Sequence, residues 1–221
     1  MHWIHYLGPL LTGAEVTAAI AIASTLLGAV LAFAAGLARA AGGIILGAIA
    51  VVYVEIFRGT SLLVQLFWLY YALPLLGVSL PPVTTGVLGL ALNIGAYGAE
   101  VVRGAVRAVP HDQHEAARAL NFSRAYTLWH VVLPQAVPEM MPPFGNLAVQ
   151  NLKDTSLVSM ITIADLTFRA QELRNLTLDS VPIYTLTLIL YFVLALGLLA
   201  VMRWLEARLR HGAAIPRVVH A

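Results

Sequence analysis

Long apolar segments separated by short polar ones dominate the chain. Five of these segments, at about 11–37, 60–76, 86–108, 144–165 and 182–202, have the length and character of bilayer-crossing helices. Composition agrees, because 60% of the residues are hydrophobic and 11% are charged. The pattern therefore predicts an all-α integral membrane protein with about five transmembrane helices in a single domain over residues 1–221.

A further apolar segment, 44–57, is too short to cross a bilayer comfortably. Glu55 and Arg58 close it, and their spacing predicts an ion pair across one helical turn. We interpret the segment as an interfacial helix or as a steeply bent entry into the span at 60–76.

Small residues recur at helical spacing in two places. Gly43 and Gly47 form one ridge, and Ala91, Gly95 and Ala99 form another. Such ridges allow helices to approach closely in a membrane. Five helices make a poor closed pore, so a second copy or a similar partner is expected.

Basic residues indicate the orientation, because cytoplasmic segments are enriched in Lys and Arg. With the N-terminus outside and the C-terminus inside, two arginines lie outside, Arg169 and Arg174. The cytoplasmic arginines are then Arg39, Arg58, Arg103, Arg107, Arg118, Arg124, Arg203, Arg208, Arg210 and Arg217. A sixth span at 44–57 would spoil this asymmetry, so we predict five spans.

The longest polar interruption, at about 110–134, predicts a helix-turn-helix on the cytoplasmic face. Asp112 is expected to cap a helix over 113–120, with Glu115 reaching back as in a capping box. Asn121 tolerates the left-handed conformation that ends a helix.

A second helix is expected to follow this turn. Ser123 is its predicted cap, and Pro134 and Pro138 are predicted to limit it. Pro142 and Pro143 are then expected to open the span at 144–165.

Polar side chains recur along one face of the span at 86–108. Asn93, Tyr97, Glu100, Gly104 and Arg107 follow one another at spacings of four and three residues. Lipid does not solvate such a stripe, so it faces the bundle interior or water. It lines a solute path, or it forms hydrogen bonds between helices, with Glu100 pairing locally with an arginine.

Span 144–165 also contains polar and charged residues at its centre. Lys153, the only lysine, and Asp154 point about 100 degrees apart on a helix and are poor mutual partners. Each charge is costly there unless it is paired or hydrated. Solute binding and a structural charge network both explain these residues, and the candidates for the path are Gln150, Lys153, Asp154 and Ser156 together with Asn93, Tyr97 and Glu100.

Catalytic chemistry finds little support in the sequence. Cysteine is absent, which excludes thiol nucleophiles and thiolate metal sites. His111 and His114 have no further clustered ligands, and no phosphate-binding Gly-rich loop ending in lysine is present. We therefore predict no cofactor, no metal site and no ATP hydrolysis by this chain.

The polar loop resembles a motif of known permeases. Glu115-Ala116-Ala117, position 121, and the Val131-x-Leu133-Pro134 run resemble the Glu-Ala-Ala loop of ABC-importer permeases, although Asn121 replaces the family's glycine. The resemblance implies a type I importer permease fold with a short coupling helix that docks on a separate ATPase subunit. The implied coupling residues are Asp112, Glu115, Ala116, Ala117, Arg118, Asn121, Leu133 and Pro134.

Two further motifs resemble the polar-amino-acid branch, the histidine/glutamine/arginine permeases. They are Glu55-Ile-Phe-Arg-Gly-Thr followed by Val64-Gln65, and Lys153-Asp-Thr-Ser-Leu157. Within this branch, segments 67–74 and 164–168 look most like the permeases of ectoine/hydroxyectoine importers.

The resemblance implies an ATP-driven importer permease in the bacterial cytoplasmic membrane, with a small polar or zwitterionic solute such as an amino acid or ectoine. Its implied partners are a pair of ATPase subunits, a second permease and an extracytoplasmic solute-binding protein; nothing points to nucleic acid. The alternative is a stand-alone ion-coupled carrier or channel that would use Glu100, Lys153 and Asp154, although such a carrier has no need of a coupling loop.

Overall fold

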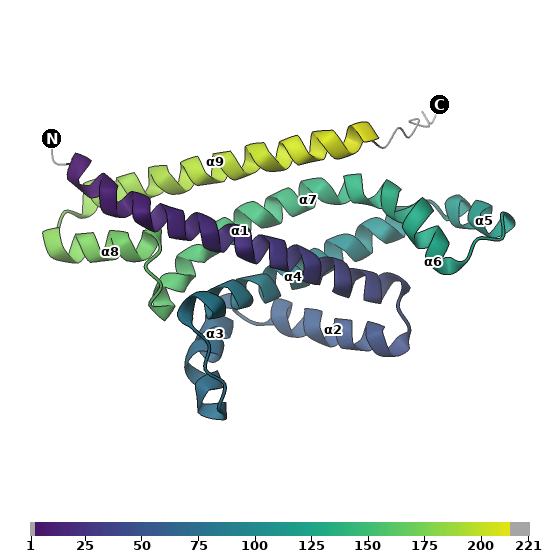
Figure 1. Cartoon of the computed structure of the whole chain (residues 1–221), viewed down its shortest axis with the longest axis horizontal. Helices are drawn as coiled ribbons and strands as arrows, with labels where there is room; N and C mark the ends of the chain where they lie inside the picture. Colours follow the sequence, from purple (N-terminus) through teal and green to yellow (C-terminus); the bar gives the residue numbers. More distant parts are fainter. Residues whose placement is uncertain (1–2, 213–221) are drawn as a thin grey trace.

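The computed structural model describes residues 3–212 as an elongated bundle of helices (Figure 1). The start of α1 and the end of α9 lie at opposite ends of the molecule, and α5 lies at the same end as the end of α9. The helices are α1 (Trp3–Ala41), α2 (Ile44–Gly59), α3 (Leu62–Phe67), α4 (Pro82–Ala108), α5 (His111–Ala119), α6 (Arg124–Thr127), α7 (Leu133–Asp154), α8 (Leu166–Thr177) and α9 (Ser180–Gly212). Arg217, expected in a cytoplasmic tail, lies outside the described residues.

Shorter helical turns join these elements. A π-helical turn (Trp68–Ala72) and a 3-10 turn (Leu73–Leu76) continue α3, and a second π-helical turn (Leu128–Val132) joins α6 to α7. A 3-10 helix (Thr155–Ile161) extends α7.

Within residues 3–212, three helices are long and apolar enough to cross a membrane, at His5–Ala41, Pro82–Ala108 and Ser180–Leu209. A fourth candidate is the pair formed by α2 and the helical segment Leu62–Leu76, which meet at an angle of 105°. The all-helical membrane fold is therefore as predicted, with three to four candidate spans by this criterion. α7 is not among them, and it contains three prolines in its interior.

The contact between α1 and α4 depends on glycines. A β-carbon built on Gly36 would lie 2.8 Å from the carbonyl oxygen of Ala99, and one built on Gly95 would lie 2.9 Å from the β-carbon of Leu31. Contacts this short leave no room for a side chain. The ridge of Ala91, Gly95 and Ala99 is fully or nearly fully buried, so it packs inside this chain.

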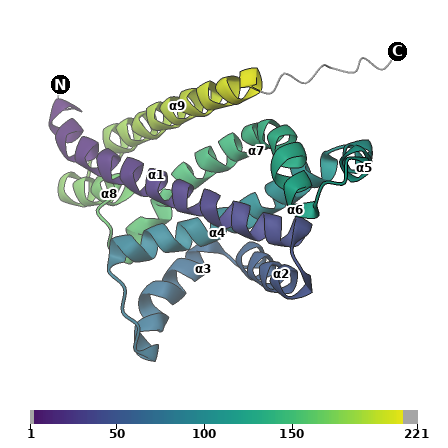
Figure 2. The ribbon, with the colours of Figure 1, turned by 45° about the vertical axis from the view of Figure 1, so that its right-hand side comes forward.

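The segment at 44–59 forms the bent alternative of the two that the sequence left open. α2 runs back beside α1 and α4, and its Ala50 and Val54 are buried with Ala35 and Ala99 in one apolar cluster. Beyond the bend, α3 and its continuation project away from the bundle (Figures 1 and 2). Gly43, at the start of α2, is open to the surface.

Two side-chain amides satisfy the backbone where this span breaks. Gln65 and Asn93 both donate hydrogen bonds to the carbonyl oxygen of Phe57, at 2.9 and 3.0 Å. Gln65 also donates to the side chain of Thr60 at 2.8 Å. Because lipid offers no hydrogen bonds, carbonyls freed by a helix break in a membrane require such partners.

The helix that follows the polar loop is longer than predicted. Ser123 caps α6 as expected, since its hydroxyl accepts a hydrogen bond from the backbone N–H of Tyr126. Pro134 does not limit the helix, because the turn before it widens: the N–H of Leu133 donates to the carbonyl of Leu128, five residues back. A wide turn keeps the proline ring from clashing with the preceding turn.

Three further prolines lie inside α7 instead of marking its ends. Pro138 does not stop the helix, and Pro142 and Pro143 do not open it; all three are interior. Pro138 is itself buried. Contacts with neighbouring helices outweigh the hydrogen bonds that these prolines cannot donate.

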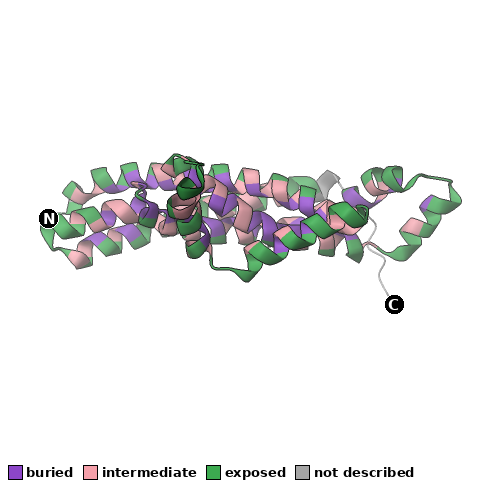
Figure 3. Ribbon diagram, turned by 90° about the horizontal axis from the view of Figure 1, so that it is seen from below, coloured by how far each residue is buried: buried purple, intermediate pink, exposed green. Residues whose placement is uncertain are grey.

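The outer faces of the long helices carry most of the exposed apolar residues, while buried positions follow their inward faces (Figure 3). In α9, only 6% of the apolar stretch that makes it a candidate span is buried. Beside this helix, Asp165 caps α8 by accepting a hydrogen bond from the N–H of Phe168 at 2.8 Å. The N–H of Leu166 donates to Thr17 on α1 at 3.0 Å, which joins α8 to the bundle.

We predict that Gly36→Ala destabilises the bundle, whereas Gly104→Ala does not. The added methyl at position 36 meets the Ala99 carbonyl oxygen and Val102, but no atom lies within 4 Å of it at position 104. Overpacking of this kind costs about 1–3 kcal/mol, and alanine otherwise favours a helix. Thermal unfolding of the two variants in detergent measures the difference. Equal midpoints for both variants and the wild type would contradict the packing described for α1 and α4.

Candidate functional site

The polar loop forms a short helix at one end of the molecule (Figure 1). α5 begins at His111, with Pro110 at its cap position, so the prediction of an Asp112 cap is wrong. Proline already holds the extended conformation required before the first turn, which places Asp112 inside that turn. There its charge interacts favourably with the helix N-terminus.

The capping box is also absent, since Glu115 contacts His111 instead, with 3.2 Å between its Oε1 and the Nδ1 of the histidine. The predicted turn at Asn121 is confirmed. This residue has a φ of 60°, in the left-handed region. The N–H of Phe122 donates to the carbonyl of Ala117 at 3.0 Å, as expected where a left-handed residue ends a helix.

Most predicted coupling residues lie on the surface of this loop. Ala117 is buried on α5, and Leu133 is buried in the apolar cluster of α4 and α7. The remaining residues of the predicted set are exposed: Asp112, Glu115, Ala116, Arg118, Asn121 and Pro134. Six of the eight predicted coupling residues are therefore accessible on the surface.

Exposed aromatic residues accompany this surface. The ring of Tyr126 lies 4.6 Å from the ring of Phe122 and 4.1 Å from that of His130, centre to centre. All three side chains are exposed. These residues were not predicted from the sequence. Their spacing of four residues, which places the rings on one face of a helix, was the signal that could have identified them.

A cavity of about 470 Å³ lies where the bend between α2 and α3 meets α4 and α7. Four of the seven predicted path residues line it: Asn93, Tyr97, Gln150 and Asp154. Its other lining residues are Thr60, Ser61, Leu62, Ile94, Leu147, Asn151 and Leu157. The structure thus brings together polar side chains from two distant segments of the chain.

The polar residues of α7 are arranged as follows. The side-chain amide of Gln150 donates to Asp154 at 2.9 Å. Asn151, which the sequence analysis did not single out, is buried and donates to Ser24 and Thr25 of α1 at 2.7 and 2.9 Å. Lys153 is exposed on α7 and does not line this cavity, and neither does the half-buried Ser156.

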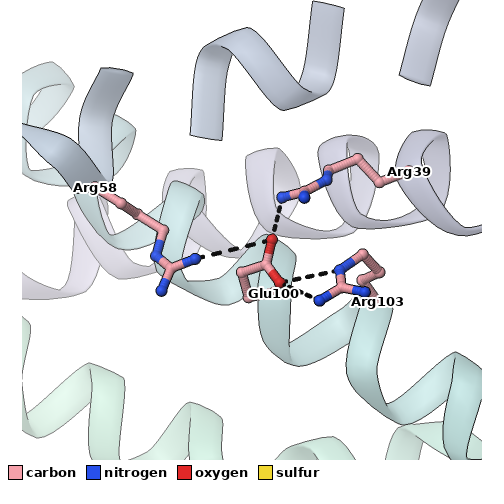
Figure 4. Close-up of polar contacts among 4 residues, drawn as sticks. All are labelled: Arg39, Arg58, Glu100 and Arg103. Atoms are coloured by element: carbon pink, nitrogen blue, oxygen red, sulfur yellow. Dashed lines mark hydrogen bonds and ion pairs between the residues drawn. The ribbon is translucent and has the colours of Figure 1, made fainter. Parts of the chain in front are cut away.

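Glu100 does not line the cavity either, because three arginines surround it (Figure 4). Arg103 donates to one carboxylate oxygen through two nitrogens, at 2.9 and 2.6 Å, and Arg39 of α1 donates to the other. A local pair of Glu100 with an arginine of its own helix was one of the two alternatives, and its partner is Arg103. The predicted pair of Glu55 and Arg58 is replaced, since Arg58 lies 3.9 Å from Glu100.

This charge cluster ties α1, α2 and α4 together, and its members are only partly exposed. Among residues 3–212, no group of three or more metal-binding side chains is close enough to hold a metal ion.

Comparison with known proteins identifies relatives over nearly the whole chain. Residues 24–211 match the family model of the binding-protein-dependent transport system inner membrane component. A probable amino-acid ABC transporter permease, y4tF of Sinorhizobium fredii, is 54% identical over 94% of this chain and 90% of its own. The glutamine transport permease GlnP of Escherichia coli is 36% identical over 91% of this chain and 93% of its own.

Solved structures agree. The crystal structure of an amino acid ABC transporter with histidines superposes with a TM-score of 0.85 at 32% identity, covering 93% of this chain and 96% of that one. The MetNI methionine ABC transporter shares the fold, with a TM-score of 0.76 at 18% identity over 92% of this chain. Together with the family match, these similarities establish that the chain belongs to the binding-protein-dependent ABC transport family, as an inner membrane permease component for amino acid import that is not itself an ATPase.

Proposed function

We propose that this permease forms the membrane path for a small zwitterionic solute, either a polar amino acid or a cyclic zwitterion of the ectoine type. The observation that carries the proposal is the cavity between α4 and α7. Its polar lining residues include two amides, a tyrosine and a carboxylate, from Asn93, Gln150, Tyr97 and Asp154. Uncharged hydrogen-bonding groups beside one carboxylate suit a solute that carries both an amino group and a carboxylate.

The family requires partners, because a binding-protein-dependent ABC system includes an ATPase and a solute-binding protein. We propose that α5 and the exposed part of its loop dock on the ATPase through Glu115, Ala116 and Arg118. We further propose that a second permease, identical or related, completes the path. A stand-alone ion-coupled carrier is not favoured, since it leaves the exposed coupling loop without a role.

The test of the proposed function is ATPase activity of the complex assembled with its ATPase, second permease and binding protein. The binding protein is supplied empty, loaded with L-glutamine or L-histidine, or loaded with ectoine. Stimulation by an amino acid alone would assign the amino-acid class, and stimulation by ectoine alone would assign the cyclic zwitterion. An assembled complex that responds to none of them would reject the proposal.

We predict that Glu115→Lys weakens association with the ATPase while the permease itself stays folded. Glu115 is exposed on α5 and contacts only its own helix neighbour His111 among the described ion pairs. Reversing its charge removes an attraction and introduces a repulsion at the proposed interface. Co-purification with the ATPase in detergent measures the effect.

The matched control is Glu172→Lys, which makes the same charge change on α8 at the other end of the molecule. This control is expected to retain the ATPase. Equal recovery of ATPase with both variants would count against docking through α5.

We predict that Asp154→Asn lowers solute-stimulated ATPase activity about tenfold or more. The asparagine keeps the size of the side chain and still accepts the hydrogen bond from Gln150, so only the charge is lost. A charged hydrogen bond to the solute is worth about 1.5–3 kcal/mol. Basal ATPase activity and the affinity of the binding protein for its solute are expected to stay unchanged. A variant with wild-type stimulation would show that the Asp154 carboxylate is structural.

A further inference from the structure

Arg58 occupies an unusual place for a charged residue. It lies at the end of α2, inside the bent pair of helices that together qualify as one candidate span. α2 begins at Ile44, beside the end of α1, so Arg58 lies about 21 Å along the helix from that start. An arginine within a membrane span is costly and marks a functional position by default.

The arginines around Glu100 are not equally engaged. Arg39 and Arg103 each donate directly to a carboxylate oxygen. Arg58 lies 3.9 Å away, beyond hydrogen-bond distance, and its side chain is the most exposed of the three at 39%. Three guanidinium groups and one carboxylate leave two positive charges in excess. This excess of positive charge favours a further anion, and Arg58, which is beyond hydrogen-bond distance of Glu100, is the least engaged of the three arginines.

The ring of Tyr97 links Arg58 to the cavity. The guanidinium carbon of Arg58 lies 5.2 Å from the centre of this ring, and the ring itself lines the cavity. Thr60, two residues after Arg58, lines the same cavity. Asn93, another lining residue, holds the end of α2 in place through the carbonyl of Phe57. The backbone at Arg58 is thus fixed beside the cavity, while its long side chain rests along an aromatic face.

The cavity has the complementary charge on its α7 side. Asp154 lines it and accepts a hydrogen bond from Gln150. A carboxylate on one helix and a guanidinium at the edge of another match the two ends of a zwitterion. Asp154 accepts its hydrogen bond from a neutral amide, and Arg58 shares Glu100 with two other arginines.

We propose that Arg58 binds the carboxylate of the transported zwitterion, while Asp154 receives its amino group. This inference rests on the proposed function and adds the residue that selects for a carboxylate. In this structure, the guanidinium lies against Tyr97 and near Glu100. When solute enters, the Arg58 guanidinium turns along the tyrosine ring toward the cavity and donates hydrogen bonds to the carboxylate of the solute. A planar guanidinium suits this role, since it contacts both carboxylate oxygens at once and stacks on an aromatic face.

The experiment measures direct binding of radiolabelled solute to the detergent-purified complex of permeases and ATPase, without the binding protein. Two pairs of probes are used: L-glutamine with 4-aminobutanamide, and L-histidine with histamine. The second member of each pair lacks only the carboxylate. The wild type is expected to prefer the amino acid over the amine about tenfold to a hundredfold, the value of one strong charged contact.

Arg58→Gln is expected to abolish this preference, because both members of a pair then bind equally weakly. Arg58→Lys is expected to keep part of it, since an ammonium group attracts a carboxylate without contacting both of its oxygens. The control is Arg107→Gln. It removes a positive charge from the last turn of α4, on the helical face that also carries Tyr97 and Glu100. This control is expected to discriminate like the wild type.

An Arg58→Gln complex that still prefers the amino acid as strongly as the wild type would overturn the inference while leaving the proposed function intact. A wild-type complex that binds and transports no zwitterion would reject the proposed function itself. If Arg58→Gln fails to assemble, Arg58→Lys decides: a reduced preference supports the inference, and an unchanged one overturns it.

Discussion

The close approach of α1 and α4 is the constraint on which the rest of the structure depends. Water is absent from the bilayer core, so helices there associate through dense packing and internal hydrogen bonds, with little help from the hydrophobic effect. Gly28 and Gly36 of α1 lie against α4, and Gly95 and Gly98 of α4 lie against α1. This contact fixes the position of α4 along the axis of α1. It thereby fixes the positions of Asn93, Tyr97 and Glu100.

The break between α2 and α3 is possible because α4 is held so firmly. Its Asn93 amide reaches the carbonyl of Phe57, which a continuous helix would have satisfied internally. Gln65, which follows the break, also donates a hydrogen bond to this carbonyl. The same break opens a polar-lined cavity between α4 and α7. The backbone irregularity and the candidate solute site are therefore one feature, in which side chains replace lost backbone partners.

Local chemistry was readable from the sequence, and contacts between distant segments were not. The left-handed turn at Asn121 and the cap at Ser123 followed from the preferences of those residues alone. The polar stripe on α4 followed from helical periodicity, yet periodicity does not say that Arg39 and Arg58 meet Glu100 from two other helices. Helix bounds near proline were the weakest predictions, because Pro134 acts through the turn before it.

Arg58 was counted as cytoplasmic because the apolar segment before it is too short for a straight span. In the structure, this segment is the first part of a bent pair that qualifies as one candidate span, and Arg58 lies near Glu100 and Tyr97 of α4. The family motif in this region was recognised correctly, but the contacts of its residues required the fold.

The two π-helical turns affect the rotation of the helical segments that follow them. Each turn ends immediately before a Leu-Pro pair, which is Leu73-Pro74 after α3 and Leu133-Pro134 at the start of α7. A π-helical turn holds one residue more than the α-helical repeat, so the residues after it are offset by about 100 degrees around the axis relative to a continuous α-helix. The π-helical turn at Leu128–Val132 therefore sets how α7, and with it Asp154, is rotated about its axis relative to the loop that precedes it.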